Sequence, residues 1–155
     1  HIAVANFKLK NNTSGSEIDV KAREFLKQIG LNYAHGTGHG VGYFLNVHEG
    51  PHAISKNNKI NFQEGVIVSN EPGYYEKNKF GIRIENLIIV KKTKLGNFFK
   101  NLTLVPIDKS LIDKKFLKKN EIKWLNDYHR NVLKNLKVYM NKAELIDLKQ
   151  ACSKI

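Results

Sequence analysis

The chain has 155 residues, of which 41% are hydrophobic and 26% charged, values that are ordinary for one globular domain. Its apolar runs are shorter than the about 18 residues that a membrane span needs, and its single cysteine excludes an internal disulfide and fits a reducing compartment. The net charge of +12 comes almost wholly from lysine, and no common nucleic-acid motif is visible. A lysine-rich solvated surface is therefore favoured over a nucleic-acid site.

The first predicted helix covers residues 17–29. Ser16 followed by Asp19 resembles a capping box at its start, and Gly30 ends it. We therefore expect Asp19 to cap the first helical turn rather than to bind a metal. Apolar residues recur at helical spacing between these ends: Ile18, Ala22, Phe25, Leu26 and Ile29.

Three histidines then fall within 14 residues, and glycine occupies every second position from 36 to 42. So many glycines disfavour a helix and predict an extended or looped backbone. In an extended segment His35 and His39 point the same way, and the glycines leave room for a substrate or another backbone. His48 lies further along, and His52, beyond a Gly-Pro turn, is expected at the surface or rim.

Two buried strands are predicted next, over residues 66–71 and 80–90, and we expect them to pair antiparallel. Residues 53–64 and the segment holding Tyr74, Tyr75 and Glu76 are predicted to be loops.

The two predicted strands carry Glu71 and Glu85, and a buried carboxylate needs a partner. Arg83 shares a face with Glu85, so the three side chains are able to form an ion network. Alternatively, the two glutamates and His39 form a mixed oxygen and nitrogen set that suits Mn, Co, Zn or Fe. The residues alone leave both interpretations open.

The C-terminal part is predicted to be helical. A polar turn is expected over residues 93–101 and a short strand over 102–106, and the sequence becomes lysine-rich from 108. Asn120 is the predicted N-cap of a helix whose apolar stripe extends to Leu136, with His129 packed on it, and Asn141 is the predicted cap of a last helix.

Four separated motifs, taken in order, resemble the catalytic half of the Xaa-Pro aminopeptidases (aminopeptidase P). They are His35-Gly36-Thr37-Gly38-His39-Gly40-Val41-Gly42, Asn46-Val47-His48-Glu49-Gly50-Pro51, Asn70-Glu71-Pro72-Gly73-Tyr74-Tyr75 and Gly81-Ile82-Arg83-Ile84-Glu85-Asn86. The segment 124–129 also resembles the C-terminal extension of the larger, mostly cytosolic members of that family. The resemblance implies an α+β pita-bread fold of the creatinase/methionine aminopeptidase kind, with residues 1–107 as its C-terminal half and 108–155 as a helical extension.

The resemblance also implies roles for particular residues. His39, Glu71 and Glu85 match ligands of a site for two divalent metal ions, usually Mn²⁺, with Glu71 also acting as the proton shuttle. The implied substrate-binding residues are His35 and His48, which also steady the tetrahedral intermediate, and Tyr75 and Arg83 match positions behind them. The implied substrate is a peptide with proline in second place, and the implied protein is a cytoplasmic homodimer assembled through its C-terminal region.

One departure from the family pattern concerns the metal ligands. The family has two further aspartate ligands on strands that precede the region resembling residues 1–7, and Asp19, Asp108 and Asp113 lie in no matching motif. We therefore expect this stretch alone to hold an incomplete site, to be inactive and to expose apolar surface. Two other functions stay open: a prolidase-type dipeptidase, and a non-catalytic pita-bread protein that binds a protein or nucleic acid.

Overall fold

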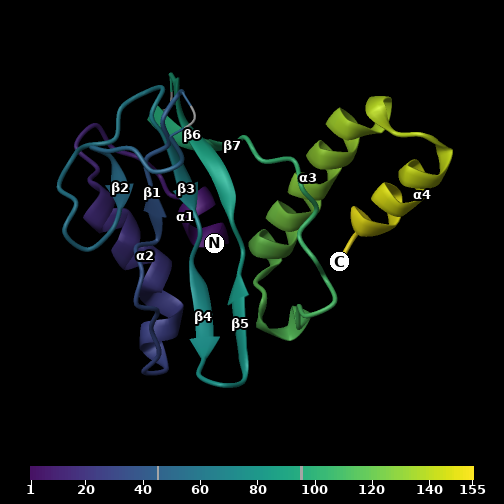
Figure 1. Cartoon of the computed structure of the whole chain (residues 1–155), viewed down its shortest axis with the longest axis horizontal. Helices are drawn as coiled ribbons and strands as arrows, with labels where there is room; N and C mark the ends of the chain where they lie inside the picture. The colour runs from purple at the N-terminus through teal and green to yellow at the C-terminus, as the bar shows by residue number, and fades with distance from the viewer. Residues whose placement is uncertain (45, 95) are drawn as a thin grey trace. The chain divides into compact units, whose positions relative to one another are not determined.

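The computed structural model describes residues 1–44, 46–94 and 96–155. Leu45, in the histidine-rich segment, and Leu95, in the predicted turn, lie outside the described residues. The chain divides into two compact units, residues 1–103 and 104–155, and each is described by itself (Figure 1). Among the described residues, no helix combines the length and the apolar character needed to cross a membrane.

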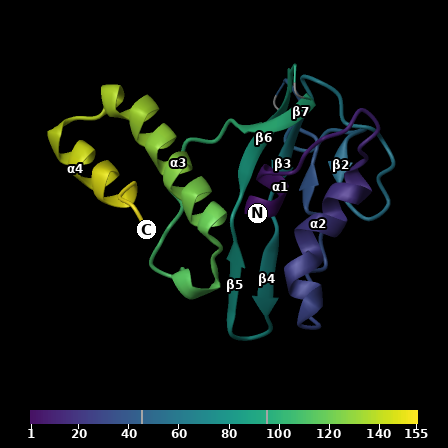
Figure 2. The same cartoon turned by 180° about the vertical axis from the view of Figure 1, so that it is seen from behind.

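The first unit combines two helices with short antiparallel strands, and α2 lies beside β1 and β2 in both views (Figures 1 and 2). Its elements are α1 (Ile2–Ala5), α2 (Gly15–Gln28), β1 (Gly38–His39), β2 (Ala53–Ile54), β3 (Ile67–Asn70), β4 (Gly73–Glu76), β5 (Phe80–Arg83), β6 (Asn86–Thr93) and β7 (Gly96–Asn101). The mixture of helices and sheets confirms the predicted α+β class.

The central sheet has the strand order β3-β6-β7, and β3 also contacts the histidine segment through a bridge between Gly40 and Val68. The predicted antiparallel pairing of segments 66–71 and 80–90 is confirmed, because Ile67 lies opposite Ile89. Burial of apolar side chains on this sheet, on the helices and on β2 supplies the core. Its fully buried members include Val4, Ile18, Ile54, Phe62, Val68, Ile88 and Val90.

Several strand predictions are wrong. Ala53–Ile54, within the segment expected to be a loop, is β2. The segment from Gly73 to Glu76, expected to be a loop, is β4, and it pairs with β5. Residues 96–101 of the expected turn form β7, and residues 102–106 are not a strand. Segment 80–90 is also interrupted between Arg83 and Asn86, so two different strands follow one another there.

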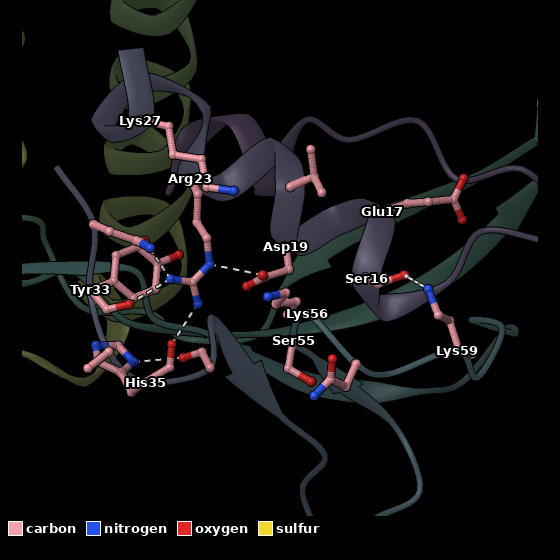
Figure 3. A pocket seen from close by; sticks show the side chains of 15 residues that line it. Ser16, Glu17, Asp19, Arg23, Lys27, Tyr33, His35, Ser55, Lys56 and Lys59 are labelled. Atoms are coloured by element: carbon pink, nitrogen blue, oxygen red, sulfur yellow. Dashed lines mark hydrogen bonds and ion pairs between the residues drawn. The ribbon is translucent and has the colours of Figure 1, made fainter. Parts of the chain in front are cut away.

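The predicted helix at 17–29 is present, but its capping residues were wrong. α2 begins two residues earlier, and its capping box joins Ser14 to Glu17. Asp19 therefore lies beyond the first turn, and its buried carboxylate binds Arg23 instead of capping the helix (Figure 3). Gly15 fixes this start, because a Cβ there would collide with the carbonyl oxygen of Ala53 on β2.

The second unit is helical, as predicted. It contains η1 (Lys114–Phe116), α3 (Lys119–Leu136), η2 (Lys137–Tyr139) and α4 (Lys142–Ala151). The N-cap of α3 is Lys118 rather than Asn120, whereas Asn141 caps α4 as predicted, its side chain accepting from the Glu144 N–H. His129 is fully buried on α3, where its Nε2 accepts a hydrogen bond from the Ile107 N–H, so it packs as expected.

Candidate metal centre

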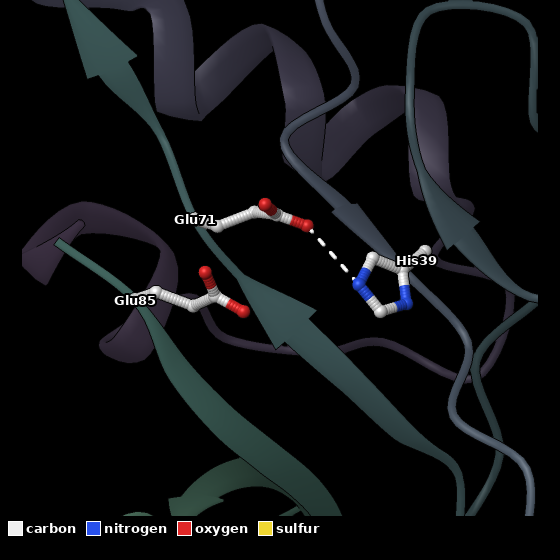
Figure 4. A group of neighbouring side chains, drawn as sticks. All are labelled: His39, Glu71 and Glu85. Carbon is white, nitrogen blue, oxygen red and sulfur yellow. Dashed lines mark ion pairs between the residues drawn. The ribbon is translucent and has the colours of Figure 1, made fainter. Parts of the chain in front are cut away.

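The two glutamates lie where the ladder between two paired chain segments is interrupted. β3 continues into β4 and β5 into β6, and both strand pairs share one register: Asn70 lies opposite Asn86, and Gly73 opposite Arg83. The residue numbers of opposite residues add to 156 in both strand pairs, and the numbers of Glu71 and Glu85 add to the same value. Continuing the register across the interruption therefore places Glu71 opposite Glu85 (Figure 4).

Two like charges facing each other across a strand pair are destabilising unless something of opposite sign lies between them. His39, from β1, completes the group. His39, Glu71 and Glu85 each offer one possible ligand atom, and these three atoms lie within 4.8 Å of one another. Two carboxylates and an imidazole suit a transition-metal ion, and Glu85 is exposed, so an ion has a route to the group.

Close packing of the histidine segment against β3, together with the Ser69 hydroxyl, holds His39 close to Glu71. Gly38 lies so near β3 that a Cβ would collide with the carbonyl oxygen of Ser69, which explains a glycine at this position. The Ser69 hydroxyl accepts from the His39 N–H at 2.8 Å and donates to Oε1 of Glu71 at 2.8 Å. Ser69 thus orients two of the three donors, and nothing in the sequence alone identified it.

Hydrogen bonding also determines which nitrogen of His39 is available. Its Nδ1 lies 3.0 Å from the carbonyl oxygen of Gly40, and a carbonyl only accepts, so Nδ1 carries the proton. In the neutral ring Nε2 then presents a lone pair, 3.3 Å from Oε1 of Glu71. Two acceptors at this distance need a proton or a cation between them, and imidazoles that bind metals commonly donate their other N–H to a carbonyl. The residues therefore fit a metal ion.

A second chain of contacts joins Glu71 to His35. Arg83 binds Oε2 of Glu71 at 3.1 Å and donates from Nε to the Tyr75 hydroxyl at 2.7 Å. That hydroxyl is 2.8 Å from Nε2 of His35, whose Nδ1 faces the Gly36 carbonyl at 2.6 Å. Nδ1 is therefore the donor, and Tyr75 donates to Nε2. The bond to Tyr75 also raises the pKa of Arg83, which stays charged.

The other predicted histidines occupy different surroundings. The exposed His48 ring lies 4.0 Å from that of His39, measured between centroids. His52 lies on Phe62 with its Nε2 near the Asn61 carbonyl, on the partly exposed surface where it was expected. A cavity of about 300 Å³ gathers the candidate groups: His35, His39, His48, Glu71 and Arg83, with Gly36 and Gly38.

The expectation that Glu85 is buried within a strand is wrong, because Glu85 is exposed in the interruption between β5 and β6. The alternative ion network is present in part, since Arg83 binds Glu71. Arg83 is itself exposed, however, and its contact with Glu71 leaves the three donors of Figure 4 grouped. The site therefore combines an ion pair with a set of metal donors.

This group of donors fits a metal ion, and the match to known families agrees with a metal-dependent protein. Residues 1–92 match metallopeptidase family M24, and residues 97–155 match the C-terminal region of peptidase M24. The chain belongs to metallopeptidase family M24 and has its pita-bread fold.

Relatives and solved structures of this family are similar over most of the chain. This chain is 50% identical to a probable Xaa-Pro aminopeptidase P of Coprinopsis cinerea, in a match that covers 85% of this chain. It is 48% identical to Xaa-Pro aminopeptidase 1 of Dictyostelium discoideum, again over 85% of this chain. The X-prolyl aminopeptidase of Caenorhabditis elegans, a cytosolic enzyme with a di-nuclear active site, matches all of it with 41% identity and a TM-score of 0.92. The chain spans only 23%, 22% and 27% of these three proteins.

Proposed function

We propose that this chain supplies part of the catalytic domain of a metal-dependent Xaa-Pro aminopeptidase, which removes an N-terminal residue that precedes proline. The observation that carries the proposal is the gathering of His39, Glu71 and Glu85 within 4.8 Å at the strand interruption. The similarity to named Xaa-Pro aminopeptidases over 85% or more of the chain supports the substrate class.

The proposed centre holds two divalent ions, which we take to be Mn²⁺. His39, Glu71 and Glu85 would hold the ions from this chain, and two aspartates upstream of it would complete the ligand set. The di-nuclear site of the Caenorhabditis elegans relative supports two ions. Bound ions of this kind polarise a scissile carbonyl and lower the pKa of a bound water.

The chain's own residues would then move a proton and hold the substrate. Glu71 is proposed to relay a proton, and its nearly buried carboxylate is held in place by Ser69 and Arg83. His35 and His48 line the same cavity and are proposed to bind the substrate and steady the tetrahedral intermediate. Tyr75 and Arg83 keep His35 in one tautomer and orientation.

A prolidase-type dipeptidase is the second candidate. The prolidase of Pyrococcus furiosus is similar over 66% of the chain, with 33% identity and a TM-score of 0.57. The match of the whole chain to the X-prolyl aminopeptidase of Caenorhabditis elegans, against 66% for this prolidase, favours the aminopeptidase. A non-catalytic binding protein is disfavoured, since metal donors would then have no reason to be gathered. We further propose a cytoplasmic location and a homodimer formed through the C-terminal region.

The test is release of the first residue from an Arg-Pro-Pro peptide by the full-length polypeptide that carries this chain, with and without Mn²⁺. We expect metal-dependent activity that Glu85→Gln abolishes. Glu76→Gln should leave it intact, because the Glu76 carboxylate is partly exposed and paired with Lys79. The 155-residue chain alone should be inactive. Inactive full-length protein without bound metal would favour a binding protein, and cleavage restricted to dipeptides would favour a prolidase.

A further inference from the structure

A buried ion pair on α2 is tied to the loop that carries His35. Asp19 and Arg23 lie one helical turn apart, are 2% and 8% exposed, and join through Oδ2 and Nε at 2.9 Å. The pair does not contact the proposed metal donors. A buried pair of this kind is a weak source of stability by itself, because the charges lose their water. Its other contacts indicate what it does.

Arg23 uses the remainder of its guanidinium to hold the main chain of the loop. Nη1 donates to the carbonyl of Tyr33 at 2.7 Å and to the side chain of Asn32, and Nη2 donates to the carbonyl of His35 at 2.6 Å (Figure 3). The guanidinium carbon of Arg23 lies over the Tyr33 ring, 3.9 Å from the ring centroid. A planar fork with several fixed donors is needed for this arrangement, and a lysine ammonium cannot reproduce it.

Asp19 extends the contacts toward Glu71 through Thr37. The Thr37 hydroxyl donates to Oδ1 of Asp19 at 2.6 Å, so the hydroxyl of Tyr33 must donate to Thr37. The carbonyl of Thr37 accepts from the N–H of Glu71 at 2.8 Å. One ion pair on the helix thus constrains the main chain at His35, through Arg23, and at Glu71, through Thr37.

We propose that Asp19 and Arg23 are positioning residues that hold the main chain of His35 and Glu71 in the geometry needed for turnover. The inference rests on the proposed aminopeptidase function, and it goes beyond that function by assigning a role to residues outside the cavity. Displacing a catalytic group by about 1 Å can lower a rate by about 100-fold, so loosening this loop should affect kinetics more than folding.

The test compares Arg23→Lys with Ala22→Gly in the full-length protein. Ala22 precedes Arg23 on α2 and packs in the core, and glycine there weakens α2 without removing a contact between Arg23 and the loop. We expect Arg23→Lys to lower kcat/KM by about 30-fold or more, through both kcat and KM, with the metal content unchanged. Ala22→Gly should change kcat and KM by less than about twofold. Equal kinetic effects of the two variants at equal loss of thermal stability would overturn the proposal.

A second pair of variants serves if Arg23→Lys does not fold. Thr37→Val keeps the shape of the side chain but removes the hydroxyl that binds Asp19, and Thr37→Ser restores it. We expect a large loss of kcat/KM for valine and recovery to within about threefold of wild type for serine. Wild-type kinetics in the valine variant would contradict the proposal.

Hydrogen exchange separates failure of this inference from failure of the proposed function. The N–H of Glu71 is protected by the Thr37 carbonyl. If the wild-type protein shows no peptidase activity, the proposed function fails. Faster exchange at Glu71 in Arg23→Lys and Thr37→Val, but not in Ala22→Gly, would still support positioning. Unchanged exchange at Glu71 in both Arg23→Lys and Thr37→Val would refute the positioning role.

Discussion

The hydroxyl of Tyr75 lies between a guanidinium and an imidazole, and the direction of its hydrogen bonds is fixed by both. We predict that Tyr75→Phe raises KM about 3- to 10-fold in the full-length enzyme, because His35 loses one hydrogen bond, which contributes about 0.5–1.5 kcal/mol. Steady-state kinetics on an Xaa-Pro-Pro peptide measures this. Tyr74→Phe is the control, since Tyr74 faces the other side of β4. An equal rise in both variants would contradict the assigned role.

His129 should make the stability of the protein depend on pH. Burial lowers its pKa, and the charge of Lys109 acts in the same direction. The folded state therefore binds this proton less readily than the unfolded state, whose histidine pKa is about 6.5. The stabilising contribution is complete above that value and is lost as the pH falls below it, through the pKa of the folded state.

The measurement is urea unfolding between pH 8 and pH 5 for wild type and His129→Gln. Glutamine can accept from the Ile107 N–H in place of the imidazole but does not titrate. We expect wild type to lose more stability than the variant across this range. Parallel pH profiles would show that His129 is not responsible.

Individual residues show where reasoning from sequence reached its limit. The resemblance selected His39, Glu71 and Glu85, which lie together in the structure. The burial of Glu85 was mispredicted because an interruption between β5 and β6 leaves no trace in a β-branched sequence. The pattern wrongly predicts Asp19 as a capping residue, because Ser16 and Asp19 have the same spacing as the true pair, Ser14 and Glu17. Tertiary contacts of Gly15 with β2 decide between them.

At the level of elements, α4 offers a direct test of a cap. Asn141 and Glu144 form a reciprocal capping box, with hydrogen bonds of 3.0 and 2.9 Å. Asn141→Ala should lower the free energy of unfolding by about 1 kcal/mol, because the Glu144 N–H at the helix start loses its acceptor, the Asn141 side-chain oxygen. Asn141→Asp, which keeps the accepting oxygen, should lose much less. Urea denaturation measures both, and equal losses would contradict the capping role.

Helices were predicted better than strands, for a physical reason. α3 and α4 carry apolar residues at a 3.6-residue period, and that pattern is local. β4 begins at the glycine of a Pro-Gly pair, and β7 contains Asn97, Lys100 and Asn101, so both resemble turns. Their formation depends on β5 and β6, which supply the opposite ladder. Pairing between separate segments is not visible in a short window of sequence.

At the scale of the whole molecule, metal binding should report how complete the site is. Among residues 1–44, 46–94 and 96–155, one group of donors gathers, with three members. We predict that the 155-residue chain binds Mn²⁺ weakly and at no more than one site, and that His39→Ala removes this binding. Isothermal titration measures affinity and stoichiometry. Two tight sites on this chain would refute the proposal that upstream ligands are required.

The chain also exposes part of its apolar surface to solvent. Val20, on α2, and Ile29, the C-cap residue of α2, are 63% and 70% exposed, in line with the expectation of exposed apolar surface. The helical spacing of Ile18 and Ile29 predicts a helix but not which apolar side chains enter the core, since Ile18 is fully buried and Ile29 is not. Only the packing of α2 on β2 and α1 distinguishes them.

The shared register of the two strand pairs has a consequence for recognising such sites in other proteins. Glu71 and Glu85 are each seven residues from Asn78, which has a φ of 61° in the connection between β4 and β5. Lengthening that connection would change the number of residues between the glutamates and leave them opposite each other. A search for this centre in distant sequences should therefore look for carboxylates placed symmetrically about a turn, and allow their separation along the chain to vary.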